Sequence, residues 1–203
     1  MVAIEVDPFL VHYLQQKFQE AIACSRLAVV DGDVLKIDLG GFAPRPVIAG
    51  NLPYYITSPI LEKVFHLEGN WSRAVFLVQA EVAERLNAAP GSRDFGYLSV
   101  LAQFHAHVEA LFPVSREAFR PSPKVDSAVV RLTPRDAARE LGIADPKKFL
   151  SFAGTCFQHK RKNLRNNLGP VYGVERIDSL PQARLRAEQL SVPELAALYK
   201  QLS

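Results

Sequence analysis

The tetrapeptide Asn51-Leu52-Pro53-Tyr54 combines residue types that could hold and polarise an aromatic amine. The exocyclic amine of adenine is a poor nucleophile because its lone pair is delocalised into the ring, and two acceptors aimed at its N–H bonds would localise that pair. The side-chain oxygen of Asn51 and a backbone carbonyl at Leu52 or Pro53 are such acceptors, and Pro53 stiffens the turn. Tyr54 offers a flat face for a base removed from its helix. Taken alone, the tetrapeptide fits a plain turn after a strand equally well.

Two carboxylates stand where predicted strands end. Glu5 closes the first strand, where it could accept hydrogen bonds from the ribose hydroxyls of a nucleoside cofactor. Asp33 follows Gly32 at the end of the second strand, where it could accept from the adenine amine of the same cofactor. Each carboxylate by itself also fits an ordinary turn or helix start.

The segment Phe119–Ser127 predicts a rigid loop that enters a strand, with two prolines that hold it extended. Phe119 would give a second stacking face for a base, and Arg120 or Lys124 would reach nearby phosphates. The alternative is that Phe119 is simply a core aromatic.

The stretch Gln158–Leu168 contains four cations and no acid, interleaved with amides and two leucines. On a helix the leucines would pack inward and the cations would face out, a pattern suited to RNA phosphates and sugar edges. A generic basic helix explains the stretch equally well. The four cations are Lys160, Arg161, Lys162 and Arg165.

Strands that alternate with helices must position these residues. Asp7-Pro8 predicts the start of a helix after the first strand. Such alternation predicts an α/β fold with an open, doubly wound sheet, in which ligands collect at the carboxyl ends of the strands. The predicted strands are Val2–Val6, Leu27–Val30, Pro46–Ala49 and Ser72–Val78, the later helices are about Ala80–Asn87 and Tyr97–Phe104, and His107–Phe112 and Val125–Leu132 form an antiparallel pair.

The charge changes along the chain. Residues 1–133 carry 12 Lys and Arg against 14 Asp and Glu, whereas residues 134–203 carry 12 against 7. The strand pattern also stops near Pro134, and short helices follow that break at Gly142, Asp145-Pro146, Gly169-Pro170 and Ser191-Val192-Pro193. We therefore predict a domain over residues 1–133 and a small helical domain over 134–203, whose positive charge suits a polyanion.

Composition narrows the class of protein. With 48% hydrophobic and 22% charged residues the chain can bury a core, and no apolar run of about 18 residues and no signal peptide is evident. We expect a cytoplasmic, monomeric protein that contacts no membrane. Cys24 and Cys156 are the two cysteines, without metal-ligand spacing, and we expect free thiols and no metal.

In order and spacing, these motifs resemble the KsgA-type small-subunit rRNA adenine dimethyltransferases over essentially the whole chain. The resemblance implies a Rossmann-like methyltransferase fold, S-adenosylmethionine as donor, and two methylations at N6 of each of two adjacent adenosines near the 3′ end of small-subunit rRNA. It also implies a role in ribosome maturation and binding to the 30S-type particle. Glu5 would bind the donor ribose, Asp33 the donor adenine, and Asn51 both the donor and the target amine. Tyr54 and Phe119 would sandwich the target base.

The family places a strand and a glycine-rich turn before the strand that ends at Glu5, and no Gly-x-Gly occurs in this sequence. We therefore expect residues 1–203 alone to bind the donor weakly and to be inactive. Two alternatives stay open. One is a non-catalytic RNA-binding or ribosome-assembly factor derived from the family. The other is a large-subunit rRNA adenine methylase, although the loop at Phe119 and the stretch Lys160–Leu168 favour the small-subunit enzymes.

Overall fold

The computed structural model describes residues 1–203 and confirms an α/β fold, but it divides the strands between two sheets. The first sheet pairs β1 (Val2–Glu5) in parallel with β2 (Ala28–Asp31). Between them lie α1 (Pro8–Lys17) and α2 (Gln19–Ala23). The predicted helix start is confirmed, since the Asp7 side chain accepts from the Phe9 amide at 2.8 Å and a proline opens the helix.

The second sheet has the strand order β3-β4-β6-β5. Its strands are β3 (Val47–Asn51), β4 (Arg73–Gln79), β5 (Ala106–Val114) and β6 (Ser127–Pro134). β3 and β4 are parallel, and β6 runs antiparallel to both of its neighbours, as the sequence predicted for the last two strands. The pairing therefore brings the carboxyl ends of β3, β4 and β5 to the same edge as the amino end of β6.

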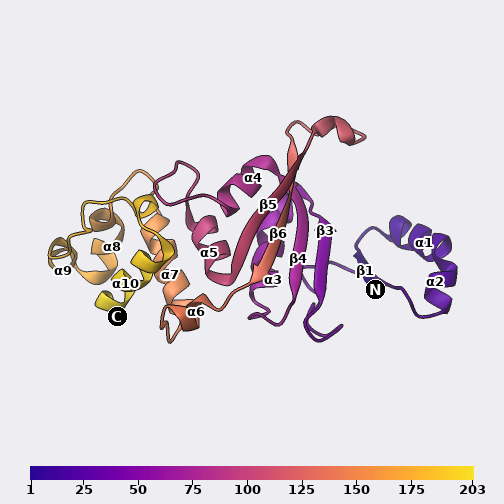
Figure 1. Ribbon diagram of the computed structural model, residues 1–203, viewed down its shortest axis with the longest axis horizontal. Helices are drawn as coiled ribbons and strands as arrows, with labels where there is room; N and C mark the ends of the chain where they lie inside the picture. Colours follow the sequence, from indigo (N-terminus) through magenta and orange to yellow (C-terminus); the bar gives the residue numbers. More distant parts are fainter.

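No strand pairing joins β1 to β3, so the two sheets do not form one continuous ladder. In Figure 1 the indigo segment with β1, α1 and α2 stands to one side of β3, and the C-terminal helices lie at the opposite end. Side chains nevertheless connect the two sheets. Ile4, Val34 and Leu35 pack against the core of the second sheet, and Lys63 donates to the Leu35 carbonyl at 3.0 Å.

The apolar residues of α1 do not form a buried face. Phe9 is 85% exposed and Leu10 48% exposed, and Val11 is the one buried residue of this helix. The helix is mostly exposed because β1 and β2 provide only a narrow two-stranded surface for it to cover.

Three helices cover the second sheet: α3 (Thr57–Phe65), α4 (Ala80–Leu86) and α5 (Tyr97–His105). The helix α3 was not predicted from the sequence. It buries Ile60, Leu61, Val64 and Phe65 against the core formed by the sheet. The helix α5 contributes to two cores, because Leu101 and Ala102 face the sheet while Val100 and Phe104 belong to the core of the C-terminal helices.

The C-terminal segment is entirely helical, with Phe149, Phe152 and Leu168 at the centre of its core. The predicted break at Gly169-Pro170 is wrong, because both residues lie within α8. Pro170 is close to the end of that helix, so its missing N–H removes little of the hydrogen-bond ladder. The helices are α6 (Ala137–Glu140), α7 (Pro146–Phe157), α8 (Leu164–Tyr172), α9 (Val174–Asp178) and α10 (Val192–Leu202). None of the helices in the structure has the length and apolar character that crossing a membrane requires.

His105 lies in an aromatic environment at the end of α5. Its ring stacks on Phe65 with centroids 5.3 Å apart and meets the edge of Phe104 at the same distance. Burial, together with the nearby His66, lowers the pKa of His105 from its ordinary 6.5 to about 4, against an opposing effect of Glu68. The imidazole is therefore neutral in the folded protein at physiological pH.

We expect His105 to make unfolding depend on pH in a defined window. Because the folded pKa lies below the unfolded one, its contribution is complete above about pH 6.5 and is lost as the pH falls towards about 4. After allowance for its partial exposure, the loss is about 2 kcal/mol. Urea unfolding across this range should show a loss that is smaller by this amount in His105→Phe than in the wild type, because the carboxylates contribute equally in both. The exposed His159→Gln is the control, and an unchanged pH dependence in His105→Phe would contradict the prediction.

Candidate functional site

The predicted tetrapeptide lies at the shared strand edge of the second sheet. Asn51 is the last residue of β3, and its register partner is Leu77 in β4. Its side chain is exposed and makes no hydrogen bond within the protein, so the amide oxygen is free to accept from a ligand. The following residue, Leu52, is buried and donates its amide to the Leu77 carbonyl at 3.0 Å. The pairing with β4 therefore fixes the backbone that carries the Asn51 side chain.

The two backbone carbonyls proposed as the second acceptor are not equivalent. The Pro53 carbonyl accepts from the Ile56 amide and from the Thr57 hydroxyl, both at 3.1 Å. The Leu52 carbonyl accepts no hydrogen bond within the protein. The geometry therefore favours Leu52 over Pro53 as the acceptor that works beside Asn51. Pro53 instead closes the turn that starts the short 3-10 helix Tyr54–Ile56.

Tyr54 is half-buried, and its hydroxyl lies 2.9 Å from the hydroxyl of Ser127. Ser127 is fully buried and begins β6, where its register partners are Gln79 in β4 and Val114 in β5. This contact joins the turn after β3 to the loop that enters β6, although the two residues are 73 positions apart.

The loop between β5 and β6 projects beyond the sheet, as the salmon segment above the strands in Figure 1 shows. Hydrogen bonds inside the loop and at its base fix its conformation. The Arg116 amide donates to the Asp126 carboxylate at 3.0 Å, and the Ser122 hydroxyl donates to the Arg116 carbonyl at 2.9 Å. The Ala80 amide donates to the Asp126 carbonyl at 3.0 Å, which ties the loop base to the start of α4.

Within this loop, Arg120 and Lys124 are exposed and their side chains have no hydrogen-bond or ion-pair partner, as expected of phosphate ligands. Phe119 is half-buried rather than a fully buried core aromatic. Its ring does not form an aromatic pair with Tyr54, so the predicted sandwich of these two rings around a base stays a prediction.

Glu5 and Asp33 lie at the carboxyl end of the smaller sheet. The Gly32 amide donates to the Glu5 carbonyl at 2.9 Å, which joins the turn that carries Asp33 to the end of β1. One carboxylate oxygen of Glu5 accepts from the Val6 and Asp7 amides at 2.8 and 2.9 Å. One oxygen of Asp33 accepts from the Leu35 amide at 2.9 Å.

In both carboxylates the second oxygen accepts no hydrogen bond within the protein. The second oxygen of Asp33 has Lys36 at 4.0 Å, a lysine whose side chain is 85% exposed. Such a pair is weak in water. The pair of carboxylates therefore fits the hydroxyl and amine donors of a nucleoside. Nothing in the strand pairing connects this pair to Asn51, which lies in the other sheet.

The basic stretch adopts a different local structure from the one predicted. Residues 158–163 form a turn, and α8 begins only at Leu164. Leu164 and Leu168 are buried, as predicted, but the amide of Asn167 is buried as well and donates to the Cys156 carbonyl at 2.7 Å. The turn between α7 and α8 is therefore fixed from inside by one asparagine.

The four cations of this stretch divide into two pairs. Lys160 donates to the Arg93 carbonyl at 2.8 Å, and Arg165 forms an ion pair with Asp178 at 2.5 Å. Hydrogen bonding to Arg165 lowers the pKa of Asp178 below its ordinary value. Arg161 and Lys162 are exposed, and neither side chain has a hydrogen-bond or ion-pair partner. These two are the cations most available to phosphate.

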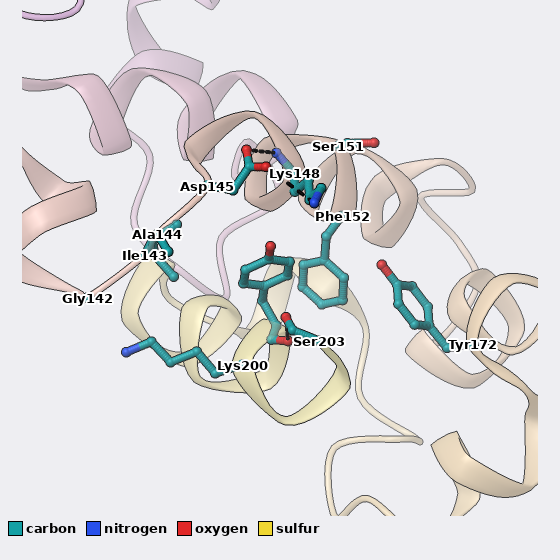
Figure 2. A pocket seen from close by; sticks show the side chains of 11 residues that line it. Gly142, Ile143, Ala144, Asp145, Lys148, Ser151, Phe152, Tyr172, Lys200 and Ser203 are labelled. Carbon is teal, nitrogen blue, oxygen red and sulfur yellow. Dashed lines mark hydrogen bonds and ion pairs between the residues drawn. The ribbon is translucent and has the colours of Figure 1, made fainter.

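A cavity of about 550 Å³ opens elsewhere, among the C-terminal helices. In Figure 2, Asp145 and Lys148 of the α7 region lie at the top, the Phe152 ring at the centre, Tyr172 to the right and Lys200 of α10 below. None of the predicted site residues lines it, and it does not reach the strand edge that holds Asn51. No group of three or more His, Cys, Asp or Glu side chains in the structure is arranged to hold a metal ion.

The chain matches the family model described as ribosomal RNA adenine dimethylase over residues 1–201. It belongs to that family. A ribosomal RNA small subunit methyltransferase A from Acidobacterium capsulatum is 43% identical over 212 residues, which cover 100% of this chain and 73% of that protein. The protein of the same name from Levilactobacillus brevis is 40% identical over 195 residues, which cover 93% of this chain and 63% of the relative.

Solved structures show the same fold. A dimethyladenosine transferase from Plasmodium falciparum superposes with a TM-score of 0.80 at 22% identity, over 98% of this chain and 82% of that one. The 23S rRNA methyltransferase ErmE superposes with a TM-score of 0.65 at 24% identity, over 99% and 81% of the two chains. The Rossmann-like fold class of this member of the rRNA adenine dimethylase family is thereby confirmed.

Sequence reasoning missed two residues that organise the site, Thr57 and Ser127. Thr57 is 2% exposed, and its hydroxyl donates a hydrogen bond to the Pro53 carbonyl. A Thr four residues after a proline carries no distinctive sequence signal. Ser127 was recognised only as the end of a loop, because its partner is distant in sequence and no spacing rule links the two.

Proposed function

We propose that this protein transfers methyl groups from S-adenosylmethionine to N6 of two neighbouring adenosines near the 3′ end of small-subunit rRNA. The observation that carries the proposal is the pair of free acceptors at the end of β3. The Asn51 amide oxygen and the Leu52 carbonyl both lack partners within the protein, while the Pro53 carbonyl is occupied. Family membership and the names of the relatives support the substrate.

The chemistry asked of Asn51 and Leu52 is polarisation of the target amine. Two acceptors on the amine N–H bonds draw the lone pair out of the ring and aim it at the incoming methyl group, so positioning and electrostatic stabilisation are the main catalytic terms. No general base is needed at the start, because an amine proton becomes acidic only as the new bond forms and then leaves to water. Tyr54 and Phe119 would hold the base by stacking.

S-adenosylmethionine would supply the methyl group from its sulfonium. Glu5, Asp33 and Asn51 would hold the donor. One oxygen of each carboxylate is bound to backbone amides and the other is free, which fixes its orientation and leaves an acceptor for a ribose hydroxyl or the adenine amine.

Residues 134–203, with their excess of cations, would form the part that binds the ribosomal particle, and residues 1–133 the catalytic part. Arg161 and Lys162 are exposed cations without partners in the protein that support this assignment, and Arg120 and Lys124 would add phosphate contacts from the catalytic part. That the protein acts as a monomer, in the cytoplasm and without metal remains a prediction.

A methyl-transfer assay with undermethylated small ribosomal subunits tests the proposal. Labelled methyl groups are expected at N6 of two adjacent adenosines, read by mass spectrometry of the digested RNA. Transfer to large-subunit rRNA, or binding to the particle without any transfer, would replace the proposal with one of the two alternatives. Donor binding is measured by calorimetry on residues 1–203 and on the protein expressed with its upstream in-frame codons. Weak donor affinity of residues 1–203 then does not decide whether the longer form binds the donor.

A further inference from the structure

We propose that Ser127 is a positioning residue, which fixes the ring of Tyr54 in the orientation that target-base stacking requires. The inference rests on the proposed function, since it assigns a role within the same site. Its basis is the contact of 2.9 Å between the two hydroxyls. Neither hydroxyl has another hydrogen-bond partner in the protein.

Ser127 is a rigid anchor for this contact. It is 0% exposed and begins β6, a strand with partners on both sides, so its backbone is held by β4 and β5 at once. A buried hydroxyl without a hydrogen-bond partner is unfavourable. An alanine at this position would make the same strand pairing and would need no such partner. The hydroxyl is therefore explained by its bond to Tyr54 and not by the packing of the strand.

The other end of Tyr54 is fixed too. The Thr57 hydroxyl and the Ile56 amide hold the Pro53 carbonyl, and this sets the backbone from which the Tyr54 side chain starts. With the backbone fixed, the ring can still rotate about its two side-chain torsions. The bond from its tip to Ser127 removes that freedom, so the ring presents one fixed plane.

An error in the plane of the stacking ring displaces the target amine from the two acceptors. Displacements of about 1 Å at a reacting centre lower rates by up to about 100-fold, whereas overall affinity for a large RNA surface depends on many other contacts. Loss of the Ser127 to Tyr54 bond should therefore lower kcat for methyl transfer and leave KM for the ribosomal subunit nearly unchanged.

The test compares Ser127→Ala and Tyr54→Phe, which remove the same bond from opposite sides while the aromatic ring stays. Each is expected to lower kcat by about 10-fold with KM changed by less than about 2-fold, and the double variant should be no slower than either single one. Ser72→Ala is the matched control. Its hydroxyl likewise makes one hydrogen bond, to the Pro46 carbonyl at 3.3 Å, but at the opposite end of the sheet, and its kcat should equal that of the wild type.

Thermal unfolding of each variant shows whether it is folded at the assay temperature, and Tyr54→Phe keeps the test decisive if the buried Ser127→Ala is too unstable. A wild-type kcat in Tyr54→Phe, or losses that add in the double variant, would overturn the positioning role. All rates are measured in the full-length context, where a wild-type protein without methyl transfer would instead overturn the proposed function, so the two failures are distinguishable.

Discussion

In the full-length context, replacing Asn51 by alanine is expected to slow methyl transfer by about 100-fold or more while the affinity for the small ribosomal subunit stays unchanged. The substitution removes an exposed amide oxygen with no partner in the protein, so the fold loses no hydrogen bond. The cations at Arg161 and Lys162 lie in a different part of the chain and are untouched. Single-turnover transfer to the subunit measures the rate, and filter binding measures the affinity.

Asn70→Ala is a suitable control for Asn51→Ala. Asn70 is also exposed, also lacks a side-chain hydrogen bond in the protein, and precedes β4, so it lies towards the opposite end of the strands. Its methyl-transfer rate should equal that of the wild type. If Asn51→Ala lost affinity and rate in equal measure, the side chain would be an RNA contact and not the acceptor of the amine.

Local patterns predicted most of the strands and helices correctly, because strand periodicity and helix capping depend on residues only a few positions apart. Alternating burial in β4 and the Asp7-Pro8 helix start are examples, since each depends on the period of the strand or on one cap. The helix α3 was missed because it follows the Pro53-Tyr54 turn directly. No side-chain cap marks its start, so no separate signal precedes the apolar residues Ile60, Leu61 and Val64.

Tertiary relations limited the remaining predictions. The apolar residues of α1 could not be placed from periodicity, because burial depends on the width of the sheet beneath them. The site residues could be chosen by type, but the choice between Leu52 and Pro53 needed the partner of the Pro53 carbonyl, a bond made by Thr57. Likewise, the sequence shows the charge of a run of cations, but it does not show which of them form hydrogen bonds or ion pairs within the protein.

The cations of the stretch after α7 should therefore differ in their contribution to RNA binding. Arg161→Ala combined with Lys162→Ala is expected to reduce the slope of log affinity against log salt by about 1.4 to 1.8, since each phosphate contact contributes about 0.7 on single strands and about 0.9 on duplex. Both side chains are exposed and without partners in the protein, so their phosphate contacts would not have to replace an internal bond.

Lys160→Ala combined with Arg165→Ala is the matched comparison, with the same change in net charge within the same stretch. Lys160 is bound to the Arg93 carbonyl and Arg165 to Asp178, so a phosphate would have to displace these partners. The slope is expected to change by less than half as much as in the first double variant. The unfolding temperature should fall instead, because Lys160 ties the turn after α7 to the Arg93 segment and Arg165 joins α8 to the end of α9.

Affinity for the small ribosomal subunit measured between about 50 and 200 mM salt separates the two cases, because screening acts on phosphate contacts far more than on the fold. Equal changes of slope in the two double variants would show that net charge alone governs binding and that the internal partners are irrelevant. An unchanged slope in Arg161→Ala with Lys162→Ala would show that these side chains are merely solvated, and the RNA surface would then have to be sought around Arg120 and Lys124, two further exposed cations without partners.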